Sequence, residues 1–172
     1  MTYILKKSEW KFQQESGKIP GYNLFTESFK TRLGLKPENL HVDLRRLEPG
    51  QFSAPYHFHR NAEEFFMILS GSMTLRSEQG FQKLQVGDLA FFEKGKNGAH
   101  QFYNSNDEPC IYLDIRTFMG FDICEFPDSG KVLLAPSMEI FQKDQVYPYF
   151  EGEFNPREFW KEEINPERSQ NT

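Results

Sequence analysis

Residues 55–71 read PYHFHRNAEEFFMILSG, and this stretch decides the fold. It places His57 and His59, two of the four histidines of the chain, one residue apart. Successive side chains of a strand point to opposite faces, so both imidazoles of an extended segment lie on the same face. Glu64 opens the next run, whose aromatic and β-branched residues predict a strand. A turn at residues 60–62 then brings the carboxylate back beside the two imidazoles.

A third histidine, His100, lies 36 residues after Glu64 in a second alternating segment. Imidazole nitrogens together with a carboxylate oxygen suit divalent transition metals. The pattern therefore predicts a four-ligand metal site made of His57, His59, Glu64 and His100. A lone histidine is usually a surface or hydrogen-bonded residue, and we interpret His41 in that way.

Two motifs contain these residues. The first reads Gly50, six residues, His57-Phe58-His59, four residues, Glu64, six residues and Gly71. The second reads Gly87, five residues, Glu93-Lys94-Gly95, four residues, His100, three residues and Asn104. Their order and spacing resemble the two motifs of the cupins, which are small metal-binding β-barrels. This chain differs in a first spacer that is one residue longer, in Glu93 at the usual proline and in two extra residues before His100.

The resemblance spans residues 40–117 and implies an all-β fold, a cupin-type antiparallel double-stranded β-helix or jelly-roll barrel. It also implies metal binding, because the ligand residues survive all three departures. Residues 112–117 and 126–132 are similar to a branch of small single-domain cupins, some of which are named sugar-phosphate-isomerase-like. The fold hosts many unrelated functions, so the resemblance specifies no reaction.

The length of 172 residues predicts a single domain with a real core. We expect three parts, an N-terminal arm at 1–36, the barrel core at 37–117 and an extension with short strands and one helix at 118–172. The arm is rich in aromatic residues, which predicts that it packs on the barrel. Asn155 and Pro156 are typical of a helix start, which places the short C-terminal helix there.

Alternation and turn residues predict the individual strands. They are expected at residues 41–47, 53–59, 64–69, 72–76, 81–86, 89–92, 99–104, 110–117, 132–135 and 139–141, with an edge strand at 27–33. Residues 64–69 and 72–76 are expected to form a hairpin around Ser70-Gly71. Residues 121–131 are expected to form a loop, and residues 93–98 a lip over a pocket.

Composition excludes several classes of function. The formal net charge of −5 argues against nucleic-acid binding, which needs basic side chains to neutralise phosphates. The longest apolar run, residues 65–69, is far shorter than the ~20 residues of a membrane span. The N-terminus lacks the pattern of a signal peptide, so we expect a cytoplasmic protein. Cys110 and Cys124 are too few for a disulfide scaffold and are not spaced as ligands.

Strand alternation also predicts the surroundings of the metal. Phe66, Ile68, Phe102 and Asn104 share the ligand face and are expected to line the pocket, whereas Glu63 faces away. Polar anchors are expected from Arg45, Arg46, Asp114 and Arg116. An arginine that faces inward would indicate a carboxylate or phosphate on the ligand.

Three functions remain open from the sequence. A three-histidine, one-glutamate set leaves up to two positions of an octahedral iron, manganese, nickel, cobalt or zinc ion free for a ligand. The first hypothesis is an enzyme acting on a small anionic or sugar-like molecule, as a metal-dependent isomerase or dioxygenase. The second is a non-catalytic module that binds a metal or small ligand. The third is a metal-free structural role for the histidines. Aromatic residues near both termini are compatible with a homodimer.

Overall fold

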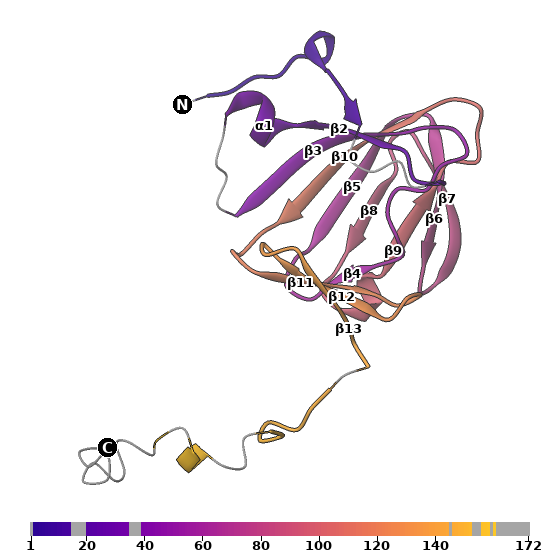
Figure 1. Ribbon diagram of the computed structural model, residues 1–172. Helices are drawn as coiled ribbons and strands as arrows, with labels where there is room; N and C mark the ends of the chain where they lie inside the picture. Colours follow the sequence, from indigo (N-terminus) through magenta and orange to yellow (C-terminus); the bar gives the residue numbers. More distant parts are fainter. Residues whose placement is uncertain are drawn as a thin grey trace. The chain divides into compact units, whose positions relative to one another are not determined.

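The computed structural model describes residues 2–14, 20–34, 39–144, 146–152, 156–158 and 160. They fall into two compact units, Met1–Gln142 and Lys143–Thr172. The first unit holds all of the strands that the described residues form (Figure 1). In the second, the described part contains the short 3₁₀ helix η3 (Pro156–Glu158). Most of the remaining positions of the helix predicted at the C-terminus lie outside the described residues.

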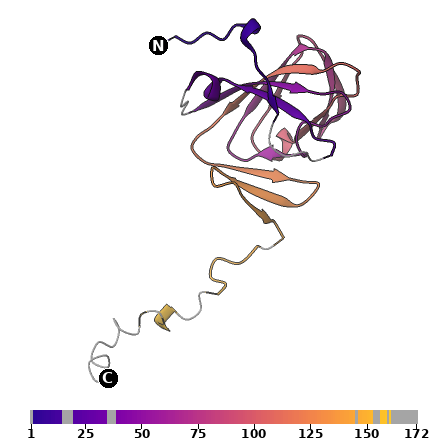
Figure 2. The ribbon, with the colours of Figure 1, turned by 45° about the horizontal axis from the view of Figure 1, so that its top comes forward.

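Three antiparallel sheets build the first unit (Figures 1 and 2). The first sheet has the order β1 (Gln13–Gln14), β2 (Leu24–Ser28), β3 (Leu40–Leu47), β10 (Cys110–Thr117), β5 (Glu64–Ser70) and β8 (Leu89–Phe92). The second has the order β7 (Gly80–Gln85), β6 (Ser72–Ser77) and β9 (His100–Tyr103). The third has the order β13 (Glu139–Gln142), β12 (Lys131–Ala135), β11 (Asp122–Phe126) and β4 (Phe58–His59). The predicted all-β, antiparallel barrel is therefore confirmed.

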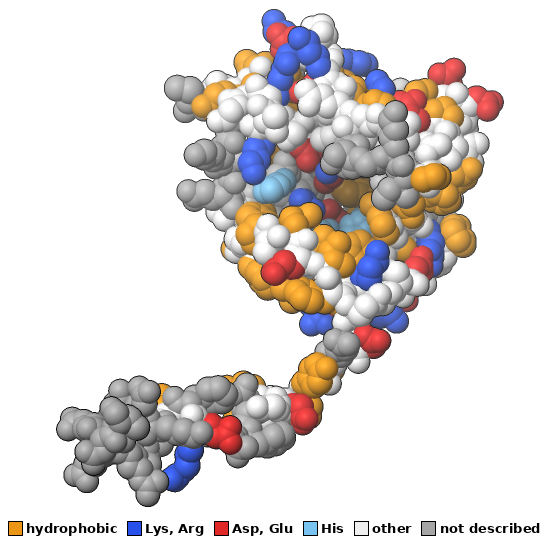
Figure 3. Space-filling view, viewed as in Figure 1, with side chains coloured by type: hydrophobic (Ala, Val, Ile, Leu, Met, Phe, Trp, Pro, Cys, Tyr) orange, Lys and Arg blue, Asp and Glu red, His pale blue; other side chains and the backbone are white. Residues whose placement is uncertain are grey.

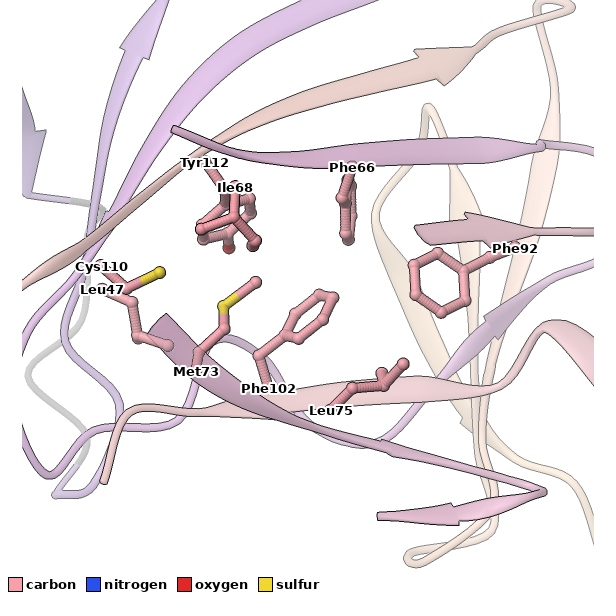
Figure 4. Close-up of a cluster of buried hydrophobic side chains, with 9 residues drawn as sticks. All are labelled: Leu47, Phe66, Ile68, Met73, Leu75, Phe92, Phe102, Cys110 and Tyr112. Atoms are coloured by element: carbon pink, nitrogen blue, oxygen red, sulfur yellow. The ribbon is translucent and has the colours of Figure 1, made fainter. Parts of the chain in front are cut away.

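A hydrophobic core lies between the first and second sheets (Figure 4). Its members are Leu47, Phe66, Ile68, Met73, Leu75, Phe92, Phe102, Cys110 and Tyr112. The ring of Phe66 lies 5.3 to 5.5 Å from the rings of Phe92, Phe102 and Tyr112, centroid to centroid. Burying each such side chain contributes about 1.5–3 kcal/mol. The prediction that Phe66, Ile68 and Phe102 line the pocket at the metal ligands is wrong, because they fill this core.

The fourth residue expected to line the pocket, Asn104, is also buried and has a structural role. Its side-chain amide donates hydrogen bonds to the carbonyl oxygens of Leu47 (3.0 Å) and Glu108 (2.9 Å). These bonds tie the end of β9 to the end of β3 and to the loop before β10. A buried amide whose donors are both satisfied stabilises this corner of the barrel instead of contacting a ligand.

The hairpin expected around Gly71 does not form. Strand β5 pairs with β10 and β8 in the first sheet, whereas β6 pairs with β7 and β9 in the second. Gly71 has a φ of 75°, and a Cβ placed on it would lie 2.7 Å from the carbonyl oxygen of Pro109. The chain therefore passes from one sheet to the other at a point where only glycine fits.

Other local predictions need correction. Residues 29–33 form the helix α1 (Phe29–Leu33) in place of a continued edge strand, and it ends at Gly34 in the left-handed region. Of the strand expected at 53–59, only β4 is regular. Strand β8 has the predicted bounds and is an edge strand with Leu89 and Phe91 exposed.

The remaining short helices lie in loops. They are η1 (Lys7–Glu9) and η2 (Lys96–Gly98). Within the described part of the chain, no helix is long and apolar enough to cross a membrane. The division into arm, core and extension at residues 36 and 117 stays a prediction.

Candidate metal centre

The four ligand candidates come from different parts of the barrel and meet at one place. Glu64 is the first residue of β5 in the first sheet, His100 the first of β9 in the second, and His59 the last of β4 in the third. His57 precedes β4 and pairs with His100 through two backbone hydrogen bonds of 2.9 and 3.2 Å. The main chain thus holds two of the histidines side by side.

Short distances confirm that the side chains converge. The Nε2 atom of His100 lies 3.2 Å from Oε2 of Glu64, and Nε2 of His59 lies 3.5 Å from Oε1 of the same carboxylate. The ligand atoms of His57, Glu64 and His100 all lie within 4.8 Å of one another. The imidazole of His57 is 5.1 Å from that of His59, centroid to centroid. The structure therefore brings together all four residues that the sequence singles out.

Each imidazole is held by a hydrogen bond from its Nδ1 atom. His57 donates to the carbonyl oxygen of Pro55 at 2.8 Å and His100 to that of Gly98 at 2.9 Å. His59 donates to the carboxylate of Asp122. Carbonyl and carboxylate oxygens only accept, so the proton of each ring is on Nδ1 and the lone pair is on Nε2. All three histidines thus present a metal-binding lone pair.

Two buried atoms at the centre have no hydrogen-bond partner among the described residues. They are Nε2 of His59 and Oε2 of Glu64. A buried polar atom without a partner costs about 1–3 kcal/mol. Both face the space between the ligands, where a cation would satisfy them. Three imidazole nitrogens and a carboxylate oxygen suit a divalent transition metal, so the residues present fit such an ion.

The ionisation state of His57 agrees with this fit. Burial lowers the pKa of His57 to about 3, so the imidazole is neutral at pH 7. Metal ligands must be deprotonated, and the fold keeps His57 in that state without a metal.

Sequence reasoning missed Asp122, which fixes the orientation of His59. Its second carboxylate oxygen accepts a hydrogen bond at 2.9 Å from the backbone N–H of Asn61. Burial raises the pKa of Asp122, but the bond to His59 and the backbone donors lower it by more. The net pKa is therefore below the usual value, and the carboxylate is ionised at neutral pH. The prediction of a loop at residues 121–131 is wrong, since strand β11 occupies Asp122–Phe126. No local signal points to a partner 63 residues from His59.

Cys124 is a second residue that sequence spacing did not place at the site. It is the cross-strand partner of His59, and its Sγ lies within 4.8 Å of the ligand nitrogens of His57 and His59. Burial, followed by the charge of Asp122, raises the pKa of its thiol to about 12. The group is therefore a neutral thiol beside the candidate ligands.

A pocket of about 580 Å³ opens onto His57 and His59. Its basic lining residues are Lys30, His41 and Arg116, and its apolar wall includes Phe118, Phe126, Leu133 and Met138. Figure 3 shows pale-blue histidine side chains inside a hollow with basic and hydrophobic side chains around it. The volume suits a small molecule that lies against the histidines.

Of the four predicted polar anchors, only Arg116 is among the residues that line this pocket. Arg45 binds Asp114 at 3.0 Å, and Arg46 binds Glu48 at 2.7 Å. His41, which we interpreted as an ordinary surface residue, also lines the pocket. The loop at residues 93–98 is absent from the lining and supports the histidines from behind, because the N–H of Gly95 donates to the carbonyl oxygen of His59 at 2.8 Å.

Comparison with known proteins agrees with this architecture. The family profile of the cupin domain matches residues 43–116. A search of functionally curated proteins by sequence found no match. The structure of a protein from Acidithiobacillus ferrooxidans, provisionally named a sugar phosphate isomerase, has 25% sequence identity and a TM-score of 0.75. The match covers 84% of this chain and 95% of that one.

Two further solved structures share the fold. A sugar phosphate isomerase from a cupin superfamily, from Silicibacter pomeroyi, is 24% identical with a TM-score of 0.71, over 85% of this chain and 96% of that one. A predicted oxalate decarboxylase from Thermotoga maritima is 17% identical with a TM-score of 0.54, over 67% and 99% of the two chains. Together, the profile match and the barrel show that residues 43–116 of this chain are a cupin domain.

Proposed function

We propose that the chain binds one divalent transition metal through His57, His59, Glu64 and His100, and that the metal acts on a small anionic or sugar-like molecule in the adjoining pocket. The observation that carries this proposal is the set of three Nε2 lone pairs around the carboxylate of Glu64. Nε2 of His59 and Oε2 of Glu64 are buried there without a hydrogen-bond partner among the described residues. A metal in such a site polarises a carbonyl or hydroxyl oxygen of the ligand when it is bound.

An isomerase is the reaction class that we favour. Support comes from the protein of Acidithiobacillus ferrooxidans, whose provisional name is sugar phosphate isomerase and whose structure matches 84% of this chain. The chain's own residues would hold the substrate against the apolar wall while Arg116 contacts an anionic group. Iron in the same site would favour a dioxygenase instead, because iron(II) with open positions binds dioxygen.

One observation favours a second candidate, a non-catalytic module that binds a metal and a small ligand. Isomerisation needs a base beside the substrate. Among the described residues that line the pocket, the only carboxylate is Asp122, and its oxygens already accept from His59 and Asn61. A homodimer and a cytoplasmic location stay predictions.

The experiment that tests the proposal is metal analysis of protein purified without an affinity tag or added metal. We expect about one equivalent of a transition metal in the unmodified protein and none in the double variant His57→Ala/His59→Ala. The matched control is His41→Ala, which removes the one histidine outside the ligand set and should leave the metal content unchanged. An unmodified protein that takes up no metal even from excess would contradict the proposal. Iron would direct assays to oxygen chemistry, and zinc, manganese, cobalt or nickel to isomerase assays.

A further inference from the structure

The first sheet carries a row of three polar side chains across neighbouring strands at the metal centre. Arg116 on β10 is the cross-strand partner of His41 on β3 and of Glu64 on β5. Directly paired residues of antiparallel strands share one face of the sheet. The guanidinium confirms this, since Nη1 of Arg116 lies 3.9 Å from Oε1 of Glu64. The row therefore runs from the candidate metal ligand Glu64 to a basic end made of Arg116 and His41.

A third basic group joins this end from outside the sheet. Lys30, on α1, lines the same pocket as His41 and Arg116. Burial, followed by the positive charges of Arg116 and Lys30, lowers the pKa of His41. The two charges thus act on the same imidazole. Three groups from three separate elements converge on one end of the pocket.

The described acidic residues match the positive charge at this end only in part, and Asp43, the acidic group that acts on His41, is already paired with Arg45. Within the described residues Lys30 makes no ion pair, and the only acidic neighbour of Arg116 within ion-pair distance is Glu64 at 3.9 Å. That carboxylate is the candidate metal ligand, and Asp122, the one carboxylate among the described residues that line the pocket, is bonded to His59. Unmatched cations beside an apolar wall attract an anionic group, and the planar guanidinium suits a carboxylate or a phosphate.

We propose that Lys30, His41 and Arg116 form a subsite for the phosphate or carboxylate group at one end of the ligand. The other end of the same ligand binds the metal beside Glu64. This inference rests on the proposed function for the position of the metal. Neighbouring strands lie about 5 Å apart, so the row places the anionic group about 5–10 Å from Glu64. At about 1.5 Å per bond, a chain of about three to seven bonds joins the two ends of the ligand. The ligand is thus a short, hydroxylated or carbonyl-bearing molecule with one anionic terminus.

The test measures binding of three related probes, ribose 5-phosphate, ribonate and ribose, to the metal-loaded protein by calorimetry. We expect at least one anionic probe to bind about tenfold or more tightly than neutral ribose. The anion that binds more tightly decides between phosphate and carboxylate. Arg116→Gln should weaken that probe by about tenfold to hundredfold, because a hydrogen bond between two charged groups is lost. Lys30→Gln should weaken it by about threefold to tenfold and leave ribose unaffected.

Lys83→Gln is the matched control, since Lys83 lies on β7 and does not line this pocket. It should leave all three affinities unchanged. The inference is overturned if ribose binds as tightly as both anions, or if Arg116→Gln and Lys30→Gln bind the anion as well as the unmodified protein does.

Metal content and thermal unfolding of each variant separate this outcome from a failure of the proposed function. A protein that holds metal but shows no anion preference overturns the subsite alone. If no metal binds, titration of the metal-free protein with inorganic phosphate decides the subsite separately, again by comparison with Arg116→Gln and Lys30→Gln. Phosphate binding that both variants weaken supports the subsite, and binding that neither weakens overturns it.

Discussion

The carboxylate of Asp122 accepts the Nδ1 proton of His59, although 63 residues separate the two in the sequence. Strand β11 brings them together, because Cys124 of β11 pairs with His59 of β4. The same carboxylate accepts from the N–H of Asn61, so it fixes the turn that follows the two histidines as well as the imidazole itself. Orientation of this ligand therefore depends on the third sheet.

Replacing this carboxylate should weaken metal binding. We expect Asp122→Asn to lower metal affinity about 10–100-fold, since an amide no longer holds the imidazole in one tautomer or raises its basicity. Competition with a chromogenic chelator measures the change. Asp128→Asn is the control on the same hairpin, because Asp128 pairs with Arg76 at the surface. Equal metal affinities in the two variants would show that the bond to His59 has no influence on the site.

Removing the metal should lower thermal stability. A ligand that binds only the folded state, present at 100 times its Kd, stabilises by about 2.7 kcal/mol. For a chain of this size, that corresponds to a rise in Tm of about 5–10 °C. Thermal unfolding with and without a chelator measures it. In His57→Ala/His59→Ala the chelator should have no effect, and a shift of the same size in that variant would place the metal elsewhere.

Asp114 should make stability depend on pH in a defined direction. Burial raises the pKa of this carboxyl to about 6 in spite of Arg45, whereas an unfolded aspartate titrates near 3.8. Between these values the folded state holds a proton that the unfolded state has lost, so stability falls as pH rises from about 4 to 6. The full contribution is on the order of 3 kcal/mol.

The readout for Asp114 is the difference in unfolding free energy between the unmodified protein and Asp114→Asn, from urea titrations at pH 4, 5, 6 and 7. The unmodified protein should lose stability relative to the variant over this range, because asparagine does not titrate. Parallel curves for the two proteins would rule out a raised pKa at this position. Other carboxyls titrate in both proteins and cancel in the comparison.

Gly71→Ala should destabilise the barrel strongly. The new Cβ would lie 2.7 Å from the carbonyl oxygen of Pro109, and φ is 75°. We expect a loss of about 3 kcal/mol or more, since backbone strain and a clash with main chain add together. Gly80→Ala is the matched control, because φ there is 105° with nothing within 4 Å. Chemical denaturation should show a smaller loss in the control, and similar losses would mean that the contact with Pro109 is unimportant.

Most of the barrel could be predicted from local patterns. Strand β10 has the predicted bounds, and β3, β7, β9, β12 and β13 lie within about one residue of theirs. Alternation identifies such strands because one face of each is buried. The separation of β5 and β6 into different sheets was not predictable in this way. A Ser-Gly turn between two strands is typical of a hairpin, and only the close approach of Pro109 shows that the chain instead changes sheets.

Two classes of information can be separated in the site. The spacing of His57, His59 and Glu64 is local, since strand geometry alone places their side chains within reach of one another. The sequence by itself thus determined the barrel, the donor types and the candidate ligands. Their physical basis is the two-residue period of a strand together with the chemistry of imidazole and carboxylate groups.

Only the tertiary structure decided what surrounds those ligands. Asp122 and Cys124 reach His59 through the pairing of β11 with β4, and His41 meets Arg116 through the register of β3 with β10. Lys30 reaches the same pocket from α1. These contacts depend on which strands pair and in which register, which is set by burial summed over the whole core. A short-range pattern in the sequence does not contain that information, so the basic end of the pocket can be identified only in the folded chain.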